Sequence, residues 1–259
     1  MTRAVDLNSD LGESYGRWTL GDDAAMAQHI TSANLACGLH AGDFSIIDAT
    51  VRLCTRHGVS VGAQPSFPDL QGFGRRAMQM SSEDVEQCVL YQIGAVHAFC
   101  RGHGVDLQHV KPHGALYNQA AADPQLARGI ARAVARFSRE LLLVGLAGST
   151  AFEEAADEAG VRLVSEAFAD RRYNPDGSLQ SRSIAGSLLT DPDAAAEQVL
   201  KLVCDGTVVA HDGSRVSVGA QSICFHGDTP GAPVIVARAR ARLEETGVRV
   251  RPMRELLSG

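Results

Sequence analysis

Four short stretches of the sequence share one layout, in which an apolar run stops at a polar cluster of glycine with histidine, aspartate or asparagine. They are residues 5–10, 35–43, 110–114 and 223–228. Such an apolar run is typical of a buried strand, and the residues that follow it leave the core. In a parallel α/β fold the carboxyl ends of the strands lie on one face, where ligands bind. We therefore expect the four clusters to converge at one enzyme-like site.

Apolar runs and helical patterns alternate along the rest of the chain. Strands are predicted at 4–8, 32–37, 59–63, 107–111, 141–146, 161–165, 221–225 and 248–251. Helices are predicted at 22–29, 45–57, 82–103, 124–139, 150–159, 193–204 and 231–246, and a hairpin at 207–218. Ser81 and Asp84 predict a capping box at the start of the helix over 82–103.

Seven or eight strand–helix units in this length fit an α/β fold of the irregular (β/α) barrel type, with seven strands. An open doubly wound sheet is the alternative. However, no G-x-G-x-x-G follows the first strand and no phosphate-binding P-loop motif occurs. Because the chain shows neither a linker nor an internal repeat, we expect one domain over 1–259.

Composition excludes several classes of protein. The net charge of -6 and the isoelectric point near 5.8 argue against a nucleic-acid partner. No stretch approaches the roughly 18 uninterrupted apolar residues of a membrane helix, and the N-terminus lacks a signal-peptide core. The six cysteines form no C-x-x-C pair, which predicts reduced thiols. We expect a cytoplasmic protein; whether it forms a homo-oligomer stays open.

The stretch after the predicted strand 107–111 is dense in reactive residue types. Lys111 can neutralise a carboxylate or phosphate, and His113 can shuttle a proton or bind a metal. Tyr117 follows on the predicted turn into a helix. The alternative is a tight turn with a solvated lysine, but two such residues at one strand end favour a functional site.

Acidic residues gather after the first two predicted strands. Asp6, Asn8 and Asp10 alternate, so they share one face of an extended strand, and Glu13 follows. With His40 and Asp43 after the second strand, these side chains could divide acid and base roles or bind a divalent ion. The candidate metal ligands are Asp6, His40 and His113. No tight ligand pair such as H-E-x-x-H supports the metal.

Two further segments could bind an anion. His226, Gly227 and Asp228 close a strand and open a helix, where free backbone N–H groups can hold a phosphate. Arg75 lies in a loop rich in glycine and proline, and its guanidinium matches carboxylate or phosphate oxygens. The aperiodic segment 168–190 is long for a compact domain, and such loops are usually functional.

Six ordered motifs resemble those of the LamB/YcsF family, in which the characterised members are the A subunits of bacterial 5-oxoprolinases. They lie at 6–13, 33–43, 72–76, 110–118, 167–177 and 226–232. The resemblance covers essentially the full chain. It implies an irregular barrel related to the glycoside hydrolase/deacetylase group. It also implies ATP-dependent opening of the lactam 5-oxo-L-proline to L-glutamate, together with partner subunits B and C.

One position departs from the family pattern, which usually reads Gly-Ala-His-Pro where this chain has Gln64. A glutamine amide has no titratable proton, so Gln64 cannot replace a histidine that serves as a base. This departure keeps two alternatives open. One is a metal-dependent hydrolase or deacetylase of small amides that needs no ATP, and the other is a non-catalytic subunit.

Our hypothesis assigns one role to each part of the site. Lys111 and Arg75 would clamp the substrate carboxylate or a phosphate, and His113 or His40 would transfer the proton. Asp6 and Asp10 would act as base or orient it. The turn from Gly227 to Gly231 would meet phosphate or an oxyanion. Asn8, Glu13, Asp43, Tyr117, His226 and Asp228 are expected to contact the substrate or phosphate.

Overall fold

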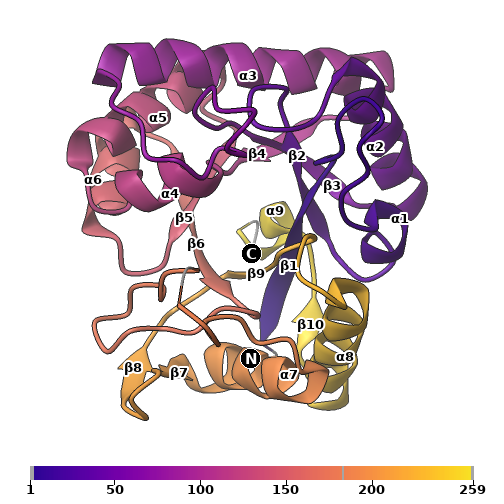
Figure 1. The fold of residues 1–259 in the computed structure, drawn as a ribbon, viewed down its shortest axis with the longest axis vertical. Coiled ribbons are helices and arrows are strands. Elements are labelled where there is room, and N and C mark those ends of the chain that lie inside the picture. The colour runs from indigo at the N-terminus through magenta and orange to yellow at the C-terminus, as the bar shows by residue number, and fades with distance from the viewer. Residues whose placement is uncertain (1–2, 183, 258–259) are drawn as a thin grey trace.

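Seven parallel strands close into a barrel, because the last of them pairs back with the first (Figure 1). A computed structural model describes residues 3–182 and 184–257. The barrel order is β1 (Ala4–Leu11), β2 (Ser32–Ala36), β3 (Ser60–Gln64), β4 (Leu107–Val110), β5 (Leu142–Leu146), β6 (Arg162–Phe168) and β9 (Ser222–Phe225). The predicted seven-stranded barrel is therefore confirmed, and the open doubly wound sheet is not the fold.

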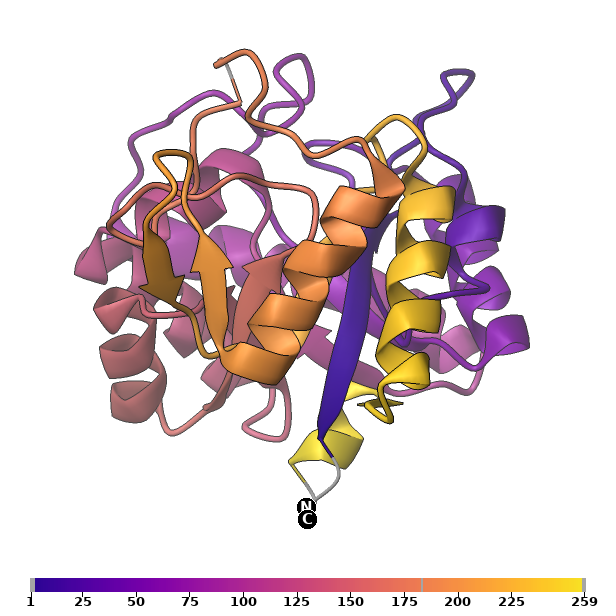
Figure 2. The ribbon, with the colours of Figure 1, turned by 90° about the horizontal axis from the view of Figure 1, so that it is seen from below.

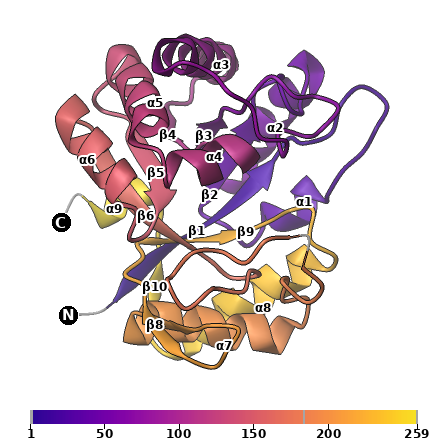
Figure 3. The same cartoon turned by 60° about the vertical axis from the view of Figure 1, so that its left-hand side comes forward.

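Helices surround the barrel on its outer side (Figures 1 and 3). They are α1 (Asp23–Met26), α2 (Phe44–His57), α3 (Ser82–Gly102), α4 (Gly114–Ala120), α5 (Pro124–Phe137), α6 (Thr150–Ala159), α7 (Pro192–Leu200), the π-helix η1 (Lys201–Asp205) and α8 (Ala232–Glu245). Ser81 caps α3 as predicted, because its Oγ accepts a hydrogen bond from the backbone N–H of Asp84. The Asp84 carboxylate accepts from the Ser81 hydroxyl, whereas the acid of a capping box accepts from the backbone N–H of the cap residue.

The element boundaries differ from the prediction in a few places. Strand β1 runs on to Leu11 instead of ending at residue 8, because its polar residues stay paired with β2 inside the barrel. Strand β6 likewise continues to Phe168, paired with β9. The short helix α1 ends at Met26, and α4 was not predicted. The hairpin is confirmed as the antiparallel pair β7 (Thr207–Val209) and β8 (Arg215–Ser217).

The barrel interior is polar along β1. Asp6, Asn8 and Asp10 all face it, as predicted from their alternation, and Asn34 of β2 donates hydrogen bonds to both Asn8 and Asp10. Space for these side chains depends on Gly62 in β3. A Cβ atom at Gly62 would lie within 2.1 Å of the imidazole of His109, whose Nε2 pairs with Asn34. Gly62 thus makes room for an imidazole that holds Asn34 in place.

The two ends of the barrel differ. Helix α9 (Met253–Leu256), which follows the short strand β10 (Arg249–Val250), closes the end at which β1 begins, where Met253 packs on Leu142, Val144 and Val164. Figure 2 shows the long loops gathered at the opposite end, where the barrel strands finish. In residues 3–182 and 184–257, no helix has both the length and the apolar character to cross a membrane. All six cysteines are free thiols, as expected.

Candidate active site

Lys111 follows β4 and is buried at the loop end of the barrel. Its Nζ lies 3.0 Å from Oδ1 of Asp10 and 3.1 Å from Oε1 of Glu166. It also donates to Sγ of Cys224 at 2.9 Å. Burial alone would lower the pKa of Lys111, but Asp10, Cys224 and Glu166 outweigh burial and hold this pKa well above its usual range. Lys111 is therefore a fixed cation.

The two carboxylates beside Lys111 are held by further hydrogen bonds. Asn34 donates to Oδ1 of Asp10 at 2.8 Å. Glu166 accepts from Asn8 at 2.9 Å and from the hydroxyl of Tyr117 at 2.9 Å. Burial raises the pKa of both carboxyls. Lys111 and nearby histidines reverse the effect at Asp10, whose pKa falls, whereas the pKa of Glu166 stays raised. The site thus contains two carboxyls with opposite protonation tendencies.

A second cluster joins Glu13, His40 and His113. The two imidazoles stack with their centroids 4.0 Å apart. Oε1 of Glu13 lies 3.6 Å from Nδ1 of His113 and 4.0 Å from Nε2 of His40. Burial lowers the pKa of His113 to about 3 and that of His40 well below its usual value. It raises the pKa of Glu13, and the charge of Asp10 adds to this effect. Both imidazoles are neutral at pH 7.

The loop after β3 fixes the tautomer of His113. The carbonyl of Phe73 lies 3.0 Å from Nε2 of His113. Since a carbonyl only accepts, Nε2 carries the proton and Nδ1 keeps a free lone pair. The Phe73 ring stands edge-on to both imidazoles, and its backbone has a φ of 56°, in the left-handed region. Strain of this kind at a non-glycine residue is characteristic of functional sites.

The same cluster has the donor set of a metal site. Ligand atoms of Glu13, His40 and His113 lie within 4.8 Å of one another. Oε1 of Glu13 and both ring nitrogens of His40 are buried without a hydrogen-bond partner, as are both amide atoms of Gln64. Gln64 lies close enough to His40 to affect its pKa. Buried polar atoms are normally satisfied, so these residues fit a divalent cation.

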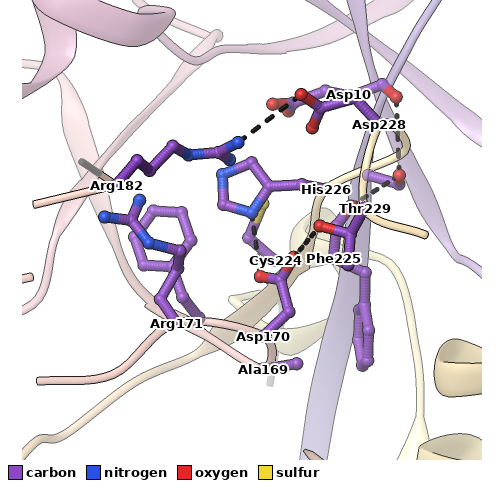
Figure 4. Close-up of polar contacts among 12 residues, drawn as sticks. Asp10, Ala169, Asp170, Arg171, Arg182, Cys224, Phe225, His226, Asp228 and Thr229 are labelled. Carbon is purple, nitrogen blue, oxygen red and sulfur yellow. Dashed lines mark hydrogen bonds and ion pairs between the residues drawn. The ribbon is translucent and has the colours of Figure 1, made fainter. Parts of the chain in front are cut away.

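His226, at the end of β9, is oriented by a buried carboxylate. Its Nδ1 lies 2.8 Å from Oδ1 of Asp170, and Thr229 donates to the other oxygen of Asp170 at 2.6 Å (Figure 4). The imidazole also stacks on Phe168. Since Asp170 is charged and its pKa is lowered, it holds a proton on Nδ1. The Nε2 face of His226 remains for a ligand.

A cleft of about 710 Å³ opens over Lys111. Its lining residues include Asp10, Arg75, Lys111, His113, Tyr117 and His226. Arg75 spans one side of the opening, where it pairs with Asp228 at 2.5 Å. Residues from the ends of β1, β4 and β9 therefore share one cavity, as three of the four sequence clusters predicted. The fourth cluster, 35–43, does not line the cavity, and its His40 stacks on His113.

The sequence comparison identifies the family. The LamB/YcsF family profile matches residues 5–258. A protein of Chloroflexus aggregans, named as the A subunit of 5-oxoprolinase, is 52% identical over 251 residues, which cover 97% of this chain and 99% of that relative. The chain belongs to the LamB/YcsF family.

Two solved structures place this LamB/YcsF protein among known folds. The crystal structure of the lactam utilization protein from Thermus thermophilus is 50% identical, with a TM-score of 0.90, and the match covers 96% of this chain and 99% of that one. Peptidoglycan deacetylase PdaC from Bacillus subtilis is 9% identical with a TM-score of 0.50, covering 99% of this chain and 91% of that one. The second likeness concerns the fold alone.

Seven of the thirteen predicted site residues are not among those that line the cleft: Asp6, Asn8, Glu13, His40, Asp43, Gly227 and Asp228. Asp6 is buried deeper in the barrel, where its carboxylate accepts from Thr31, Ser32 and Ser222. Asp43 caps α2 by accepting from the backbone N–H groups of Ser45 and Ile46.

Gly227 packs against the end of β1, since a Cβ there would come within 2.7 Å of the Asp10 carbonyl. This close approach explains why residue 227 is a glycine.

Sequence reasoning missed several residues of the site. Glu166 lies inside β6, which was predicted to end at residue 165, so no polar cluster marked it. His109 was assigned no role although its imidazole fills the barrel interior. Asp170 and the arginines Arg171 and Arg182 lie in the aperiodic segment 168–190. Its length and the family motif at 167–177 indicated function there, but no role was assigned to these residues.

Proposed function

We propose that this LamB/YcsF protein is the A subunit of an ATP-dependent 5-oxoprolinase that works with subunits B and C in the cytoplasm. The complex would open the lactam of 5-oxo-L-proline to L-glutamate. Support comes from the name of the 52% identical relative and from the likeness to a lactam utilization protein. The observation that carries the proposal is the cationic Lys111, held between two carboxyls beside the neutral His113 on one cleft.

The chemistry explains why such a site is needed. Amide resonance protects a lactam from water. Transfer of the γ-phosphoryl group of ATP to the lactam oxygen releases ADP and makes the carbonyl carbon more electrophilic. One water adds to that carbon, the C–N bond breaks and the nitrogen takes up a proton. A second water releases phosphate and leaves L-glutamate. Both steps develop negative charge on oxygen, so fixed cations and a base accelerate them.

The residues of the cleft would divide these tasks. Lys111 and Arg75 would stabilise the anionic oxygens, because both cationic side chains line the cleft. His113 would take the proton of the attacking water, since its Nδ1 lone pair is free and its imidazole is neutral. Asp10 and Glu166 would hold Lys111 in place. Asp6 would be a positioning residue deeper in the barrel, where its carboxylate accepts hydrogen bonds from Ser32 and Ser222.

The side chains of Glu13, His40 and His113 fit a divalent metal ion. This fit favours a second candidate function. Bound there, such an ion would polarise a carbonyl or lower the pKa of a water molecule. The protein would then be a metal-dependent hydrolase of small amides that needs no ATP. The buried and unpartnered atoms of Glu13 and His40 are the observation behind this candidate.

Glutamate release by the chain reconstituted with subunits B and C tests the proposal. We expect release from 5-oxo-L-proline only with ATP, and at least a hundredfold loss in His113→Ala. Full turnover by His113→Ala would refute the assignment of the base. Release without ATP, together with stoichiometric metal, would favour the second candidate. Unchanged release in both His113→Ala and Lys111→Met would instead indicate a non-catalytic subunit.

A further inference from the structure

Arg171 is a buried cation with few partners. Only 6% of its surface is exposed, although it lines the cleft. One guanidinium nitrogen donates to the carbonyl of Gln180 at 2.6 Å, whereas the buried Nε has no hydrogen-bond partner. Among residues 3–182 and 184–257, no carboxylate forms an ion pair with Arg171. A buried charge without a counter-charge is strongly unfavourable.

Arg182 increases the local positive charge. It lines the same cleft, and Figure 4 shows both arginine side chains on the same side of the His226 imidazole. Burial and the neighbouring Arg182 lower the pKa of Arg171 to about 10, and the attraction of the Asp170 carboxylate offsets this only in part. The carboxylate of Asp228 lies 3.4 Å from Arg182, but it also pairs with Arg75 at the shorter distance of 2.5 Å. Arg171 thus has no ion pair of its own among the described residues, and Arg182 shares Asp228 with Arg75.

We propose that Arg171 and Arg182 form an oxyanion subsite of the cleft, separate from the Lys111 cluster. Two guanidinium groups that line one cleft can together meet the oxygens of a carboxylate or a phosphoryl group. The bound oxyanion supplies the ion-pair partner that Arg171 lacks among the residues that the structure describes. This inference rests on the proposed function, because the ligand is either the carboxylate of the lactam substrate or a phosphoryl group from ATP.

The two sources differ in what binds. A carboxylate subsite distinguishes 5-oxo-L-proline from 2-pyrrolidinone, which has the same lactam ring without the carboxylate. A phosphoryl subsite binds inorganic phosphate and is indifferent to the lactam. Lys111 is already paired with two carboxyls, so the anionic group of the ligand binds to the two arginines instead.

Equilibrium binding of these three probes tests the subsite, measured by calorimetry on the chain assembled with subunits B and C and without ATP. We expect 5-oxo-L-proline or phosphate to bind at least tenfold more weakly to Arg171→Gln and to Arg182→Gln. Arg182→Gln guards against a folding defect, because Arg182 is less buried than Arg171. Arg172→Gln is the matched control, since Arg172 is exposed and donates to the carbonyl of Gly186.

If the two variants lose binding of 5-oxo-L-proline, and 2-pyrrolidinone binds weakly to every protein tested, the ligand group is the substrate carboxylate. If the two variants lose binding of phosphate, the ligand group is a phosphoryl group. The subsite is overturned if the wild-type complex binds neither anion, or if both variants bind like Arg172→Gln. Because no turnover is involved, the subsite can fail while the complex still forms glutamate. Equally, the subsite would stand if anion binding depends on Arg171 and Arg182 in a complex that forms no glutamate.

Discussion

Nζ of Lys111 lies 3.1 Å from Oε1 of Glu166, which reaches it from β6 across the barrel interior. Asp10 holds the same ammonium group from β1 at 3.0 Å. Carboxylates from two strands of the barrel, β1 and β6, therefore fix one cation at the base of the cleft.

Lys111 should titrate at a pH well above the usual range for lysine. The chain has two lysines, Lys111 and Lys201, so side-chain ¹³C labelling of lysine gives two resonances to follow by NMR. The pKa of Lys111 is raised, so its stabilising contribution is complete below the unfolded value of about 10.4 and is lost as the pH rises through the folded value. A Lys111 signal that titrates below pH 10 would contradict this.

Replacing Glu166 by Gln should weaken both folding and function. The change keeps the shape but removes one charge from the buried ion pair with Lys111. We expect the free energy of unfolding to fall by about 2 kcal/mol and glutamate release by at least tenfold. Urea unfolding and the assay with subunits B and C measure the two effects. Glu158→Gln, which breaks a surface pair with Arg128, is the control and should change neither.

The buried carboxyl of Asp6 should make stability fall between about pH 4 and pH 6. Burial raises its pKa from 3.8 to about 6, despite hydrogen bonds from Ser222, Ser32 and Thr31. The folded state then binds the proton more tightly, so its contribution is complete below pH 3.8 and is lost as the pH rises through about 6. Relative to Asp6→Asn, the wild-type free energy of unfolding should drop by about 3 kcal/mol across this window. Parallel pH curves for the two proteins would contradict it.

Metal binding should depend on Glu13, His40 and His113, whose ligand atoms converge. We expect Zn²⁺ affinity, measured by calorimetry, to fall at least tenfold in His40→Gln and in His113→Gln. Gln64→His should raise the affinity, because it adds an imidazole beside His40. His97→Gln is the control, since His97 packs on Phe137 from α3. Equal affinities in all four variants would rule out this site.

The sequence predicted the parts of the site that follow a strand end. Lys111 and His113 stand out because an apolar run stops just before them, and Asp6, Asn8 and Asp10 because alternation places them on one face. Glu166 could not be found in this way, since it lies within a strand and its neighbours on either side give no periodic signal. A polar barrel interior hides such residues, because the usual apolar pattern of buried strands does not apply to it.

Residues held by tertiary contacts were also beyond sequence reasoning. The role of His109 depends on the missing side chain of Gly62 on a neighbouring strand. Arg171 comes to the cleft through a segment without helix or strand periodicity. The placement of Asp6 below the cleft follows from the register between β1 and β9, which pairs it with Ser222. Register is a property of two strands together, and one strand's sequence does not reveal it.

The most direct test of the account compares Lys111→Met with Lys201→Met in the complex with subunits B and C. The measurement is ATP-dependent release of L-glutamate from 5-oxo-L-proline, with folding checked by circular dichroism. Since Lys111→Met removes the cation at the base of the cleft, we predict at least a hundredfold loss, while Lys201→Met keeps the wild-type rate. Wild-type glutamate release by a folded Lys111→Met complex would contradict the account.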